Sequence, residues 1–249
     1  MAAQQTSKEA SIGMQAVIIT LTSFACQLLR RKPLNELLGE LNVRWVKQLC
    51  LGGLIGSALK LVPELILGIS GWVKWQINEI GLATLSSSLL LFAGVAVTEE
   101  LLFRGSIFQR LISGLGQRTA LLITGAFFVL THLNNPGVKG SIKLMAGVNI
   151  FLASILFGLA FIRTRALAMP LGLHWMANWM QGRVLGFGVS GTEQVGLLKP
   201  IFGDAPAWLT DGPFRLEASA PGLICLLTIL IILYEWKLSR RNMDSVVKS

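Results

Sequence analysis

Long apolar runs recur along the whole sequence and constrain its fold more than any other feature. A membrane-spanning helix needs about 20 mostly apolar residues. Runs of about that length cover Ser11–Leu29, Val46–Ser70, Ile80–Phe103, Thr119–Asn134, Leu144–Ile162, Leu167–Gly186 and Glu217–Trp236. The composition agrees, because 53% of the 249 residues are hydrophobic and only 14% are charged. The sequence therefore predicts an all-α fold, a polytopic membrane helix bundle of about seven transmembrane helices.

The formal net charge of +9 is distributed as the positive-inside rule predicts for a membrane protein. Most Lys and Arg residues lie in four segments, namely Arg30–Lys47, Arg104–Arg118, Arg163–Arg165 and the tail after Trp236. These segments alternate with less basic loops, so we expect the C-terminus in the cytoplasm and the N-terminus outside. The sequence has no basic patch interleaved with aromatic residues, which argues against nucleic acid and leaves the lipid bilayer as the expected partner.

Other features favour one integral membrane domain over residues 1–249. Cys26, Cys50 and Cys225 lie in apolar windows without metal-ligand spacing, so they are predicted to be small buried side chains. The N-terminal segment has no basic region and no clear cleavage site, so a cleaved signal peptide is not expected. Lys60 and Glu64 are four positions apart in the second window and are interpreted as a local structural pair.

Two adjacent glutamates, Glu99 and Glu100, lie inside the third apolar window. A carboxylate at the centre of a membrane helix costs at least about 2.5–3.5 kcal/mol, so function is the default explanation. Glu100 and Arg104 are four apart on one helix face, where they can neutralise each other. Glu99 lies about 100° around the helix without that partner, which makes it the candidate general base. The open alternative is a structural cluster in which both glutamates bind Arg104.

The helix that carries these glutamates is predicted to be long. Apolar residues continue its stripe to about Ile112, until Ser113 and Gly114 interrupt the pattern. This extension would bring the acidic pair to the same depth as polar residues on other helices.

The chain has two histidines, His132 and His174, and both lie in apolar windows. A turn signal at Asn134–Gly137 follows His132, so its helix is predicted to break within the membrane there. His174 and Asn178 are four apart and share a helix face. Two intramembrane histidines together with an uncommitted carboxylate indicate one shared site.

The ordered polar positions form a pattern spread over three apolar windows. The pattern is Glu99-Glu100-x-x-x-Arg104, then Phe128-x-x-x-His132, then His174-x-x-x-Asn178. It resembles the CPBP family of intramembrane proteases, which includes the Rce1-type CAAX prenyl endopeptidases and the bacterial Abi or bacteriocin-immunity proteins. The resemblance covers about residues 84–219 and implies a helical catalytic core with a cavity. It also implies a multi-pass location, which we expect to be a bacterial inner or plasma membrane.

The resemblance implies a role for each motif residue. Glu99 would activate the hydrolytic water, helped by His132. His174 and Asn178 would stabilise the oxyanion that forms at the substrate carbonyl, and such a donor is worth about 2.7–4 kcal/mol. The substrate would be a peptide or a membrane-anchored protein.

The same resemblance implies a supporting role for Glu100 and Arg104 and leaves the metal dependence of the site open. The Glu100–Arg104 pair would hold the shape of the site. A zinc-dependent metalloendopeptidase stays open, because Glu99, His132 and His174 could supply three ligands and leave a fourth position for water. No HExxH spacing is present, so direct activation of water by the carboxylate is slightly favoured.

Two other interpretations compete with this protease. Gly188-Val189-Ser190-Gly191 matches the GxSG of rhomboid proteases, but no histidine follows Ser190 in the chain, so turn chemistry is the simpler account. A non-catalytic membrane protein for binding, immunity or transport could use the same buried polar cluster.

Overall fold

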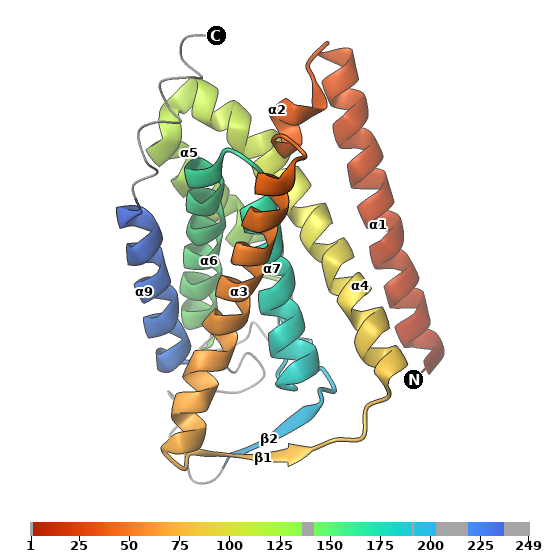
Figure 1. Cartoon of the computed structure of the whole chain (residues 1–249), viewed down its shortest axis with the longest axis vertical. Coiled ribbons are helices and arrows are strands. Elements are labelled where there is room, and N and C mark those ends of the chain that lie inside the picture. Colours follow the sequence, from red (N-terminus) through yellow and green to blue (C-terminus); the bar gives the residue numbers. More distant parts are fainter. Residues whose placement is uncertain (1, 136–141, 191, 203–218, 237–249) are drawn as a thin grey trace.

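The computed structural model describes residues 2–135, 142–190, 192–202 and 219–236 and consists mostly of helices (Figure 1). The elements are α1 (Ala2–Leu29), α2 (Leu34–Leu38), α3 (Val43–Ile69), β1 (Val73–Ile77), α4 (Leu82–Glu100), α5 (Phe108–His132), α6 (Ile142–Thr164), α7 (Ala168–Trp179), β2 (Leu198–Phe202) and α9 (Ala220–Glu235). Two π-helical segments, Leu101–Ile107 and Met180–Val184, continue α4 and α7. Every apolar window thus contains a helix, which confirms the helical class of the fold.

Four helical stretches are long and apolar enough to cross a membrane within the described residues. They are Ser11–Leu29, Leu34–Ile69, Leu82–His132 and Lys143–Thr164. The third and fourth sequence windows merge into one of these stretches, and α9 is shorter than a full span. The membrane-protein class is therefore established, whereas the number of seven spans and their orientation stay predictions.

The merged stretch from α4 to α5 changes direction at Gly116. The φ of Gly116 is +79°, in the left-handed region that glycine adopts readily. The predicted continuation to about Ile112 is confirmed, and the break falls two positions beyond Gly114. At its other end α5 stops at His132, as the turn signal predicted, while Pro136 lies outside the described residues.

A two-stranded antiparallel sheet, which the sequence analysis did not predict, lies at one end of the bundle (Figure 1). Val73 of β1 is opposite Phe202 of β2, and Ile77 is opposite Leu198. Strand β2 lies in the connection that follows Gly186, and β1 joins α3 to α4. The sheet therefore ties the connection after Gly186 to the ends of both helices.

Helix α7 lies at the centre of the bundle and packs against α3, α4 and α6 (Figure 1). The contact with α3 is a backbone contact. A Cβ atom added to Gly52 would lie 2.2 Å from the carbonyl oxygen of Met169, and one added to Gly56 would lie 2.2 Å from that of Leu173. Small residues let two membrane helices approach this closely, so these glycines fix the position of α7.

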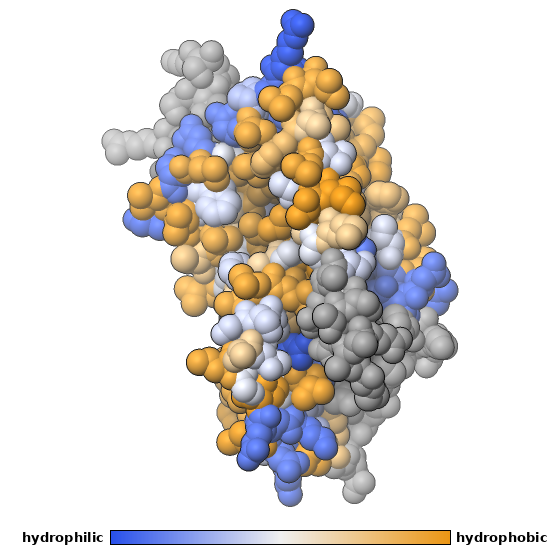
Figure 2. Space-filling view, turned by 90° about the vertical axis from the view of Figure 1, so that its right-hand side faces the viewer, coloured by the Kyte–Doolittle hydropathy of each residue, from blue (hydrophilic) through white to orange (hydrophobic). Residues whose placement is uncertain are grey.

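The outer surface carries many large hydrophobic side chains, including Leu29 and Ile69, both more than four-fifths exposed. Figure 2 shows hydrophobic side chains over much of one face, with hydrophilic groups at both ends. The prediction of three buried cysteines is wrong, because Cys26 and Cys50 are exposed and Cys225 is half-buried. Both exposed thiols lie on helices with outward-facing apolar sides, where a small and weakly polar group is accommodated.

Candidate active site

The predicted pair of Glu100 and Arg104 lies fully inside the protein. Arg104 Nη1 donates to Glu100 Oε1 over 3.0 Å, and both side chains are buried. Arg104 Nη2 donates to the carbonyl oxygen of Ser154 at 3.0 Å and to its hydroxyl at 2.8 Å. A buried ion pair is stable only when further hydrogen bonds satisfy its charges, and Ser154 on α6 provides two. Arg104 is therefore a core residue and not one of the loop cations that indicate membrane orientation.

Aromatic rings connect the guanidinium of Arg104 to both histidines. The guanidinium carbon lies 5.0 Å from the ring centroid of Phe128 and 5.0 Å from that of Phe157, within the range of cation–π attraction. The Phe157 ring stacks on the His174 ring at 4.8 Å and 10°, and the Phe128 ring lies 4.5 Å from the His132 ring. The aromatic side chains thus restrict the orientation of both imidazoles.

His174 lies between the two glutamates. Its Nδ1 atom is 2.8 Å from Glu100 Oε1. Because a carboxylate paired with Arg104 only accepts, Nδ1 carries the hydrogen and Nε2 is the free ring nitrogen. Nε2 is 3.9 Å from Glu99 Oε2, too long for a direct hydrogen bond and suited to contact through a water molecule. The sequence analysis did not predict that Glu100 also binds His174.

In His132, as in His174, Nε2 is the free ring nitrogen. Its Nδ1 atom is 2.8 Å from the carbonyl oxygen of Phe128, and a carbonyl oxygen can only accept. Nδ1 therefore carries the hydrogen, and the hydroxyl of Thr131 lies 3.1 Å away from the same atom. This leaves Nε2 of His132 available to accept a proton or a hydrogen bond from another molecule.

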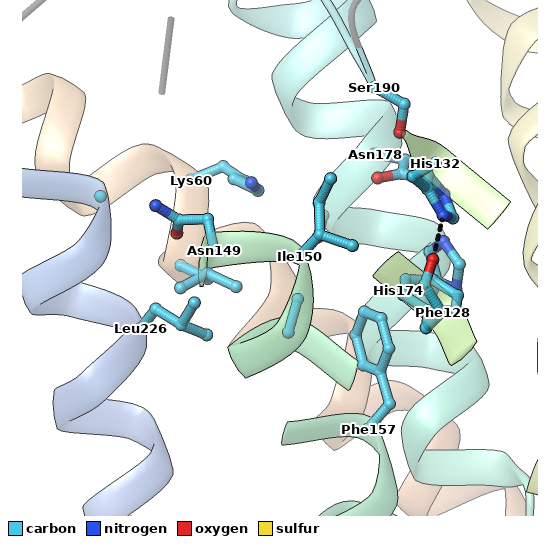
Figure 3. Close-up of a pocket in the computed structure, with 14 residues that line it drawn as sticks. Lys60, Phe128, His132, Asn149, Ile150, Phe157, His174, Asn178, Ser190 and Leu226 are labelled. Atoms are coloured by element: carbon cyan, nitrogen blue, oxygen red, sulfur yellow. Dashed lines mark hydrogen bonds between the residues drawn. The ribbon is translucent and has the colours of Figure 1, made fainter. Parts of the chain in front are cut away.

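A cavity of about 70 Å³ brings three of the predicted site residues together (Figure 3). His132, His174 and Asn178 line it, and Phe128 and Phe157 form part of its apolar wall. A cavity of this size has room for water beside the imidazoles.

Glu99 does not line this cavity. It lies next to His174 Nε2, its side chain is 25% exposed, and its Oε2 atom has no hydrogen-bond partner among the described residues. The acidic group and the cavity are thus connected through His174.

Three further polar residues line the cavity, although the sequence analysis gave them no role in the site: Lys60, Asn149 and Ser190. Lys60 was interpreted as part of a local pair. Ser190 has a φ of +48°, which fits its assignment to a turn, yet its side chain lies beside Asn178 and His132 in Figure 3. Asn149 is a single amide in an apolar run, and such isolation is the signal that could have identified it.

Two of the three helices that carry the motif, α4 and α7, continue as π-helix just after their functional residues. The segment Leu101–Ile107 follows Glu100, and Met180–Val184 begins two positions after Asn178. Such segments insert an extra residue into a turn and occur frequently at functional sites. Here the first segment places Arg104 so that it reaches both Glu100 and Ser154. Helical periodicity in the sequence cannot predict this local change.

The residues considered for zinc are Glu99, His132 and His174. Within the described part of the chain, no group of three or more His, Cys, Asp or Glu side chains is close enough to hold a metal ion. Nδ1 of His174 is bonded to Glu100 and Nδ1 of His132 to a backbone carbonyl, so the Nε2 atoms are the nitrogens that remain for a ligand. The possible zinc dependence of the site therefore stays a prediction.

Comparison with known proteins supports the resemblance inferred from the motifs. Residues 81–180 match the family model described as Type II CAAX prenyl endopeptidase Rce1-like. The matched region runs from α4 to the end of α7 and contains every motif residue from Glu99 to Asn178. No curated protein and no solved structure matched the chain. Residues 81–180, about two-fifths of the chain, are therefore similar to the Rce1-like family of type II CAAX prenyl endopeptidases.

Proposed function

We propose that this protein is an intramembrane endopeptidase that hydrolyses a peptide bond with water activated by Glu99. The family supports a membrane protease, and one geometric observation supports these roles. His174 lies between the carboxylates of Glu99 and Glu100 and also lines a cavity shared with His132 and Asn178. Peptide hydrolysis needs a base for water and donors for the developing oxyanion, and these side chains are of the required types.

Glu99 is the proposed general base because it is the acidic group without a committed cation. Arg104 pairs with Glu100, whereas Glu99 Oε2 has no hydrogen-bond partner among the described residues. An ionised carboxylate oxygen in this state accepts a proton from water and later gives it to the leaving amine. His132 assists through Nε2, because its Nδ1 is held by a backbone carbonyl. A positioned general base contributes about 10²–10⁴-fold to the rate.

Asn178 and His174 are the proposed donors to the oxyanion. The side-chain amide of Asn178 donates without carrying a formal charge. His174 can donate from Nε2 only as an imidazolium, because its Nδ1 hydrogen is used by Glu100. Glu100 thus has a defined part in the mechanism, which is to orient and stabilise the charged ring.

The proposal is tested by peptide cleavage with the purified full-length protein in detergent. A panel of quenched fluorescent peptides should include a farnesylated peptide and an unprenylated leader-type peptide, each assayed with and without a chelator. We expect Glu99→Gln to reduce kcat by at least about 10²-fold, as expected for loss of a general base, while the helical content stays unchanged. Glu79→Gln is the matched control, because Glu79 is exposed and outside the site.

Three outcomes would contradict the proposal. Near wild-type turnover by Glu99→Gln would remove the assigned base. Loss of wild-type activity with chelator would replace it with a metal-dependent mechanism. Absence of cleavage across the panel, together with a Glu99→Gln variant that keeps its cellular phenotype, would favour the non-catalytic interpretation.

A further inference from the structure

The side-chain nitrogen of Asn149, on α6, is buried and has no hydrogen-bond partner among the described residues. The residue as a whole is only 6% exposed. A buried donor left unpaired destabilises a folded protein. Native structures contain few such groups, and each calls for an explanation. An acceptor supplied by a bound molecule is one explanation, because Asn149 borders the same cavity as the predicted site residues.

The cavity has two polar ends separated by apolar side chains (Figure 3). His132 and Asn178 lie at one end. Asn149 lies at the other end, close to Lys60, with Ile150 between the two ends in the same view. The ammonium group of lysine and the amide nitrogen of asparagine are both donors. The end near Asn149 therefore has the donor chemistry to bind an oxygen acceptor, and the apolar middle has the chemistry to bind an apolar side chain.

We propose that Asn149 binds the substrate peptide by donating a hydrogen bond from Nδ2 to a peptide oxygen away from the scissile bond. The acceptor is either a main-chain carbonyl or a terminal carboxylate, and the peptide residue between the two ends packs on Ile150. This inference rests on the proposed function, in that the bound molecule is a peptide. It adds a binding residue outside the ordered motif and gives the far end of the cavity a role.

The inference predicts opposite effects on stability and on peptide binding. Replacing an unpaired buried amide by leucine removes a destabilising group, and the cavity of about 70 Å³ provides room for the larger side chain. Asn149→Leu should therefore have a Tm equal to or above that of the wild type. The same variant should bind peptide about three- to tenfold more weakly, as expected when one hydrogen bond is lost. A purely structural residue would lower Tm when it is replaced.

Binding is measured with the full-length protein in nanodiscs carrying Glu99→Gln, so that the peptide is not consumed. The probe is the fluorescently labelled panel peptide that binds this variant most tightly, prepared with a free carboxylate and with an amidated C-terminus. We expect Kd to rise about three- to tenfold on adding Asn149→Leu, and to rise also with Asn149→Asp, which keeps the shape and removes the donor. Val148→Leu is the matched control, because Val148 also lies on α6 but is exposed and does not line the cavity.

The two forms of the peptide identify the acceptor. If Asn149→Leu weakens both peptides equally, the acceptor is an internal carbonyl. If amidation weakens wild-type binding and Asn149→Leu removes that difference, the acceptor is the terminal carboxylate. Equal Kd values for Asn149→Leu and Val148→Leu, or no binding of either peptide, would overturn the inference. If Glu99→Gln still cleaves the peptide, the assigned base is wrong, and the same comparison of Kd values is made with a non-cleavable peptide analogue. Failure of the proposed function and failure of this inference are therefore recognised separately.

Discussion

A single oxygen atom, Oε1 of Glu100, accepts hydrogen bonds from Arg104 Nη1 and from His174 Nδ1. The sequence predicted the first contact, because residues four apart share a helix face. It could not predict the second, since His174 is 74 positions away and its approach depends on how α7 packs. The residue that sequence analysis classed as support is therefore the one that joins the cation to the imidazole.

Arg104 is expected to be essential for folding as well as for the shape of the site. Arg104→Met leaves Glu100 as a buried charge without its cation, and breaking such a pair costs about 3–5 kcal/mol. The double variant Arg104→Met, Glu100→Gln removes the charge as well, so it should regain part of that loss. Unfolding followed by helical content in mixed detergent with increasing denaturant measures both variants. Equal destabilisation of the single and double variants would contradict this account.

The motif residues themselves could be identified from the sequence because each is a polar residue in an apolar run. The chemistry of a low-dielectric site makes such positions conspicuous. Lys60 was also conspicuous, but the nearby Glu64 offered a local explanation that concealed its place in the cavity wall. Asn149 carries no charge, so the cost of burying it is evident only from the structure, where its Nδ2 atom has no hydrogen-bond partner among the described residues.

At the scale of helices, the close contact of α3 and α7 positions His174. Leu173, the residue before His174, has its carbonyl oxygen 2.2 Å from the point where a Cβ on Gly56 would lie. Helix boundaries could be predicted to within a few residues from hydropathy. This contact and the π-helical segments could not, because they depend on which faces meet.

Gly56→Ala is expected to separate the two helices and to displace His174. The added methyl group cannot fit against a backbone carbonyl, and overpacking of this kind costs about 1–3 kcal/mol. The Tm of the protein and its rate of peptide cleavage should both fall. Gly114→Ala is the control, because a Cβ at Gly114 meets no atom within 4 Å and alanine favours helix. Unchanged activity of Gly56→Ala would show that the α3–α7 contact does not position the imidazole.

At the scale of the whole molecule, hydropathy predicted a helical membrane protein, and the exposed apolar side chains agree. The sheet was missed, since β1 and β2 are separated by more than 100 positions and each has only five residues. Burial of cysteines was predicted wrongly, because an apolar helix in a membrane has outward faces that also accept small apolar groups. Charge distribution predicts the orientation, and this prediction can be tested directly.

The predicted orientation places the end of the bundle with β1 outside the cell. It places the turn around Ser113, in the basic segment Arg104–Arg118, in the cytoplasm. In a background with Cys26, Cys50 and Cys225 changed to alanine, Glu79→Cys should react with an impermeant maleimide in intact cells. Ser113→Cys should react only after lysis. Both positions are exposed, so reagent access depends on the side of the membrane. The reverse labelling pattern would invert the assigned topology.

Apart from Ser190, the residues that line the cavity come from five helices, α3, α5, α6, α7 and α9. A peptide bound there would touch all five, so the tilt of any one of them would alter its fit. Because helices tilt to match the thickness of the surrounding hydrocarbon, we expect peptide affinity to change with the acyl-chain length of the lipids.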